Sequence, residues 1–117
     1  MNTELVIYQH LRQLGVPANL KGYVYLQEAI RQSIGKHAEY GWMTKQLYPS
    51  IAKKYGTTAS RVERAMRHAV EFSFNNTDSE ILHQYFGNTI SSASGKLTNS
   101  QFIASVAEYI RLEVSND

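Results

Sequence analysis

Apolar residues recur every three or four positions along most of the chain, which is the spacing of amphipathic helices. We expect a first helix with Thr3 as its N-cap and with Gly15 and Pro17 just beyond its end. Residues 87–99 are rich in Ser, Thr, Asn and Gly and are expected to form a loop. The pattern predicts an all-α fold, and 117 residues fit a single domain, residues 1–117. Further helices are predicted over residues 21–33, 44–48, 49–55, 58–75, 79–86 and 99–112.

The expected core is formed by the apolar faces of the longer helices, because residues three or four positions apart share one face of a helix. A chain of this length buries enough apolar surface to fold without metals or disulfides. The residues expected to pack inward are Leu5, Val6, Leu11, Leu14, Val24, Leu26, Ala29, Ile30, Ala59, Val62, Ala65, Met66, Ala69, Val70, Phe102, Ile103, Val106 and Ile110.

Residues 51–65 meet the steric demands of a helix-turn-helix, which we expect within residues 49–75. Ala52 is small where a second helix would cross the first, and Gly56 supplies a residue that tolerates positive φ in the turn. Val62 then provides a buried β-branched residue on the second helix, and Thr57 and Thr58 offer hydroxyls to cap it. The same spacing also fits a plain pair of antiparallel helices, so charge is needed to choose between the two.

Basic residues are concentrated in this segment, although the formal net charge of the chain is only +2. Between Lys45 and His68 there are six Lys and Arg residues and one acidic residue, whereas the rest of the chain has six basic and nine acidic residues. Such a block is typical of a polyanion-binding surface, and it is also found on ordinary solvated helices.

On the predicted recognition helix, residues 58–75, three outward residues have the chemistry for reading bases. Arg61 and Arg64 could each make a bidentate contact to guanine, and Glu63 could accept from cytosine N4. The pattern therefore favours a domain that binds double-stranded DNA through the major groove. The expected phosphate contacts, each equally consistent with an ordinary surface residue, are Lys53, Lys54, Thr58, Ser60, Arg67 and His68.

Other functional classes find little support in the sequence. There is no cysteine, no metal-ligand spacing among His10, His37, His68 and His83, and no phosphate-binding glycine loop. We therefore expect no metal, no cofactor and no catalytic site. The N-terminal segment lacks the features of a signal peptide and no segment is apolar enough to span a bilayer, so we expect a soluble cytoplasmic protein without a membrane partner.

Three blocks, residues 15–29, 47–71 and 98–104, closely resemble the C-terminal effector domain of the sporulation master response regulator of spore-forming Firmicutes. The similarity extends from about residue 5 to residue 113. It implies a single six-helix domain of the response-regulator effector type, winged-helix-like but without a sheet. It also implies transcription regulation through promoter boxes similar to TGTCGAA, bound by a dimer on tandem sites.

Matching positions carry further roles of that family onto this chain. Arg61, Glu63 and Arg64 match its base-reading residues. A surface that contacts the RNA polymerase sigma factor in the family matches Glu71, Phe72, Ser73 and Phe86, although residues 72–84 depart most from the family pattern. Leu97 stands where the family tends to have proline. The family's phosphorylated receiver domain is not in this sequence, so we expect no phosphorylation control within it.

Two functions remain open on the sequence. The first is sequence-specific DNA binding. The second is a protein-interaction module that has lost DNA binding and modulates a full-length relative. Retention of Arg61, Glu63 and Arg64 favours the first.

Overall fold

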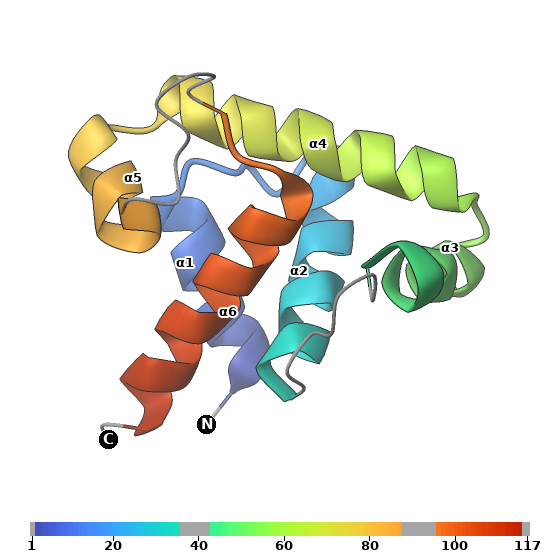
Figure 1. The fold of residues 1–117 in the computed structure, drawn as a ribbon, viewed down its shortest axis with the longest axis horizontal. Coiled ribbons are helices and arrows are strands. Elements are labelled where there is room, and N and C mark those ends of the chain that lie inside the picture. Colours follow the sequence, from blue (N-terminus) through green and yellow to red (C-terminus); the bar gives the residue numbers. More distant parts are fainter. Residues whose placement is uncertain (1, 36–42, 88–95, 116–117) are drawn as a thin grey trace.

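A computed structural model describes residues 2–35, 43–87 and 96–115, and in these ranges every regular element is helical (Figure 1). The all-α prediction is confirmed for this part of the chain, and the predicted bounds differ from the observed ones by a few residues. Most of the predicted loop, residues 88–95, and also His37 lie outside the described residues. The elements are α1 (Thr3–Gln13), α2 (Lys21–Gly35), the π-helical turn η1 (Met43–Leu47), α3 (Tyr48–Tyr55), α4 (Ala59–Asn76), α5 (Ser79–Phe86) and α6 (Asn99–Ser115).

Helix α1 begins one residue earlier than the predicted cap implies. Asn2 has an extended backbone and its side chain accepts a hydrogen bond from the Leu5 N–H at 3.2 Å. Thr3 is already helical, so the prediction of Thr3 as N-cap was wrong. Both residue types cap helices well, and the backbone conformation decides between them.

Helix α2 lies at the centre of the fold and packs against α1, α4 and α6 (Figure 1). Helix α4 crosses α2 and α6, with α3 beneath its N-terminal end and α5 near its C-terminal end. Gly22 permits α2 to lie close to α4, because a Cβ there would collide with the backbone oxygen of Ala65 on α4. The fully buried side chains between these helices include Leu26, Ile30, Val62, Met66, Phe102, Ile103 and Ile110.

Two residues predicted to pack inward are instead exposed. Leu5 is 50% exposed and Val24 is 37% exposed. Val24 shares α2 with Tyr23 and Leu26, which are both buried and which face the neighbouring helices. The apolar face predicted from the sequence is therefore wider than the part of each helix that the neighbouring helices cover.

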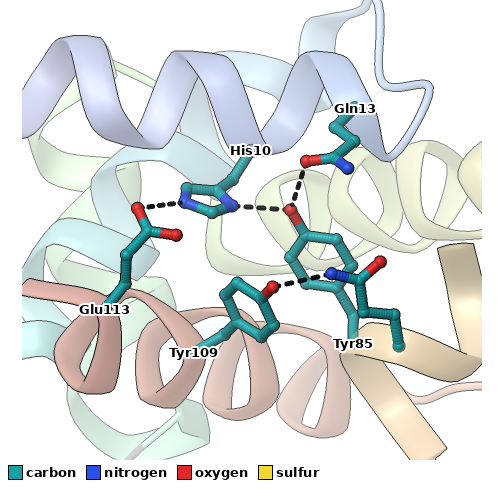
Figure 2. Close-up of polar contacts among 6 residues, drawn as sticks. His10, Gln13, Tyr85, Tyr109 and Glu113 are labelled. Carbon is teal, nitrogen blue, oxygen red and sulfur yellow. Dashed lines mark hydrogen bonds and ion pairs between the residues drawn. The ribbon is translucent and has the colours of Figure 1, made fainter.

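A polar cluster joins α1, α5 and α6 at the end of the molecule away from α3 (Figure 2). The phenol of Tyr85 donates to Gln13 at 2.9 Å, so the single hydroxyl proton is used and His10 Nδ1 donates to Tyr85 at 2.6 Å. His10 Nε2 lies 3.3 Å from Glu113, an ion pair when the imidazole is protonated. Burial is the main cause that raises the pKa of Tyr85, and the electrostatic effects of Tyr109 and Glu113 raise it further. The cluster holds three helices through side chains that are far apart in the sequence.

Candidate nucleic-acid interface

The turn between α3 and α4 has the geometry expected of a helix-turn-helix. Gly56 ends α3 in the left-handed conformation, with φ +65° and ψ +39°. The N–H groups of Gly56 and Thr57 both donate to the carbonyl of Ala52. Thr58 then has an extended backbone, and its hydroxyl accepts from the Arg61 N–H at 3.2 Å. The prediction of Gly56 as the turn residue is confirmed. Of the two predicted candidates for the helix cap, Thr57 and Thr58, the structure selects Thr58.

The helix pair buries small and branched residues at its crossing and leaves polar residues outside. Ile51, Ala52 and Val62 are buried between α3 and α4. On α4 the outward side chains of Ser60, Arg61, Arg64 and His68 are all exposed. Because Arg61, Arg64 and His68 are spaced by three and four residues, they lie on one face of α4. The structure therefore brings two of the three predicted base-reading residues together.

Glu63, the third predicted base reader, lies on the flank of α4 that faces α6. Its side chain is 35% exposed and accepts from Arg67 Nη1 at 3.1 Å. Its backbone carbonyl accepts from the side-chain amide of Asn99, the first residue of α6, at 3.1 Å. Glu63 is thus more constrained than Arg61 or Arg64, and its carboxylate already has a partner.

The two lysines of α3 have different surroundings. Lys53 is exposed, whereas Lys54 Nζ lies 2.6 Å from a carboxylate oxygen of Glu28 on α2. Arg31 Nε lies 2.7 Å from the other oxygen of the same carboxylate. The hydrogen bond from Arg31 lowers the pKa of Glu28 against the opposing effect of burial, and Lys54 adds to the lowering. Lys54 therefore links the first helix of the pair to α2, a role that the sequence did not reveal.

The predicted sigma-factor surface is only partly exposed. Glu71 is exposed and Phe72 is 37% exposed. Ser73 is fully buried and its hydroxyl donates to the Leu14 carbonyl at 2.5 Å. Phe86 is 3% exposed and packs against Phe102 with ring centroids 5.4 Å apart. Ser73 and Phe86 were therefore wrongly predicted as surface residues, because both serve the packing of the core.

A cavity of about 490 Å³ opens beside Glu63 and Arg67. Its wall includes Tyr48 at the start of α3, Phe74 on α4, and Asn99. No local sequence pattern indicated Tyr48 or Asn99 as site residues, because their hydrogen bond joins residues 51 positions apart.

Among the described residues, no three His, Asp or Glu side chains are grouped so as to hold a metal ion. In the same ranges, no helix combines the length and the apolar character that crossing a bilayer requires.

The model of a family described as "Sporulation initiation factor Spo0A C terminal" matches residues 7–110, which is most of the chain. The matched region contains the complete α3–α4 pair and the first residues of α6. This family consists of helical DNA-binding domains of transcription factors and not of enzymes. The chain therefore belongs to the Spo0A C-terminal family of DNA-binding domains, which regulate transcription in sporulation.

Proposed function

We propose that α4 enters the major groove of promoter boxes similar to TGTCGAA, with Arg61, Glu63 and Arg64 reading base edges. The observation that carries the proposal is the exposed arginine face of α4, presented by a turn of helix-turn-helix geometry. Arginine makes bidentate contacts to guanine, and a carboxylate accepts from cytosine N4. Arginine contacts to guanine and a glutamate contact to cytosine both fit a box that contains a C·G step near its centre.

Phosphate contacts would come from both helices of the pair. Lys53 and Ser60 are exposed near the turn, and Arg67 and His68 are exposed further along α4. The Thr58 hydroxyl accepts a backbone hydrogen bond and lies 3.4 Å from the Ser60 hydroxyl, so one of these two hydroxyl groups can turn its proton to a phosphate oxygen. Lys54 would have to share its ammonium group between Glu28 and the DNA. Such contacts fix the position of the protein and add affinity without selecting a sequence.

Regulation would require two further interactions. Two copies of the domain would occupy tandem boxes as a dimer. The RNA polymerase sigma factor would contact Glu71 and Phe72, the exposed part of the predicted surface. Both side chains lie on α4 beyond the proposed base-reading residues, so a sigma factor could reach them while the helix is in the groove.

Fluorescence anisotropy tests the proposal with a labelled duplex that carries two tandem TGTCGAA boxes. The control duplex has the same composition with both boxes scrambled, and both are titrated at near-physiological salt. We expect binding to the intact boxes to be at least about tenfold tighter, with an affinity that falls steeply as salt is raised. Equal affinity for the two duplexes would refute sequence-specific recognition and favour the interaction-module alternative.

A further inference from the structure

The first turn of α6 is fixed by a reciprocal pair of hydrogen bonds. The Thr98 hydroxyl accepts from the Gln101 N–H at 3.1 Å, and the Gln101 side chain accepts from the Thr98 N–H at 2.9 Å. This capping box sets the direction of the helix at its start. As a result, the next residue, Asn99, is held against the N-terminal half of α4, where it is 7% exposed.

Asn99 connects α6 to both helices of the DNA-binding pair. Its amide nitrogen donates to the Tyr48 hydroxyl and to the backbone carbonyl of Glu63, each at 3.1 Å. Since the Glu63 carbonyl can only accept, the orientation of the Asn99 amide is determined. Tyr48 is the first residue of α3, so one side chain fixes α3, α4 and α6 relative to one another.

The side chain achieves this at a cost to its own hydrogen bonding. Asn99 Oδ1 is buried, and in the described part of the chain no group lies within hydrogen-bond distance to donate to it. A buried acceptor without a partner is unfavourable, and a small apolar residue would avoid it. Asparagine at this position is therefore explained by its two donated hydrogen bonds, which fix α3 and α4 relative to α6.

We infer that Asn99 is a positioning residue for DNA recognition. It sets the position of Glu63 on α4 through its hydrogen bond to the Glu63 carbonyl, and Tyr48 in turn orients the Asn99 amide. The inference rests on the proposed function and deepens it. Arg61 and Arg64 lie on the outward face and lack this support. Replacement of Asn99 should therefore reduce the preference for one base pair more than it reduces the overall affinity for DNA.

The experiment measures discrimination, the ratio of dissociation constants for the intact box and for boxes changed at one base pair. Glu63→Gln first identifies the base pair that Glu63 reads. Asn99→Asp then keeps the shape of the side chain and favours the start of α6 by its charge, but removes the donor. We expect it to lower discrimination at that base pair about three- to tenfold, the range of a single net hydrogen bond. Discrimination at the other base pairs should be unchanged.

Three further variants make the test specific. Ser73→Ala removes another buried hydrogen bond of α4, to the Leu14 carbonyl, and should lower the melting temperature without changing discrimination. Asn99→Asp in the Glu63→Gln background should cause no additional loss at that base pair. If Asn99→Asp fails to fold, Tyr48→Phe replaces it, because it keeps the aromatic ring and removes only the hydroxyl that orients the amide.

The outcomes separate the two proposals. If the wild-type protein does not distinguish intact from scrambled boxes, the proposed function fails. If Glu63→Gln loses discrimination at one base pair while the Asn99 and Tyr48 variants behave like Ser73→Ala, the function stands and the inference about Asn99 is overturned.

Discussion

Arg64 and Arg67 are one turn apart on α4, yet their surroundings differ. Arg67 is paired with Glu63 at 3.1 Å, whereas Arg64 has no ion-pair partner within the described part of the chain. A contact from Arg64 to a base would break no existing ion pair. A contact from Arg67 to a phosphate would compete with its ion pair to Glu63. That ion pair is partly exposed and by itself contributes little to the stability of the fold. Arg64 is therefore the better residue for testing base readout.

We expect Arg64→Ala to weaken binding to the intact box by about 1–3 kcal/mol and to relax the preference at one base pair. Lys53→Ala is the matched control, because a phosphate contact carries no sequence information. It should weaken all duplexes alike and reduce the salt slope by about one. Anisotropy titrations on intact and single-substituted boxes measure both effects. Equal losses for Arg64→Ala on every duplex would remove it from the base-reading role.

At the scale of elements, two glycines shape the helix-turn-helix for different reasons. Gly56 is required by its backbone, since its φ is +65° and a Cβ there would meet no atom within 4 Å. Gly22 is required by space, since a Cβ would collide with the Ala65 carbonyl and lie 2.9 Å from the Ala69 Cβ. The first sets the turn, and the second sets how closely α4 approaches α2.

These causes predict different responses to substitution. Gly56→Ala should lower the free energy of unfolding by about 1 kcal/mol, and Gly56→Asn by less, because asparagine tolerates the left-handed region. Gly22→Ala should cost about 1–3 kcal/mol or more, because α2 and α4 must separate. Urea unfolding measures all three. A Gly56→Asn variant that is less stable than Gly56→Ala would contradict the backbone explanation.

The link between α2 and α3 through Glu28 predicts a dependence of stability on pH. The pKa of Glu28 is lowered in the folded protein, chiefly by the hydrogen bond from Arg31. Its stabilising contribution is therefore present above the unfolded-state pKa of glutamate, about 4.3, and is lost as pH falls through the folded value. Thermal unfolding of the wild type and Glu28→Gln should differ by a constant amount near neutral pH and converge below about pH 4. A difference that persists at pH 2 would exclude ionisation as its cause.

At the scale of the whole molecule, the cluster around Tyr85 joins helices from both ends of the chain (Figure 2). Tyr85→Phe would leave the His10 Nδ1 proton and the Gln13 oxygen without their partner. We expect it to destabilise the fold by about 1–3 kcal/mol, the cost of an unsatisfied buried polar group. Tyr109→Phe removes only the exposed bond from Gln84 and should have a small effect. Thermal unfolding followed by circular dichroism compares the two, and equal shifts would argue against a special role for the buried cluster.

Much of the local structure was predictable because neighbouring residues encode it. The period of apolar positions located the helices, and the spacing of Ala52, Gly56 and Val62 located the turn. The cap of α4 was predictable to within the pair Thr57 and Thr58, because a capping hydroxyl bonds to a backbone group only a few residues away, as that of Thr58 does. Where two good caps are adjacent, as Asn2 and Thr3 are, the local signal was insufficient.

The sequence by itself therefore determined the helical elements, the turn and the family of the domain, all of which depend on short-range patterns. Only the tertiary structure decided which polar residues meet. In the folded chain Ser73 and Phe86 are buried, and Lys54 forms an ion pair with Glu28. Asn99 donates a hydrogen bond to the carbonyl of Glu63, 36 positions away. No local pattern encodes such pairs, because they depend on how α2, α4 and α6 pack, and that packing is set by the fit of side chains across the whole core.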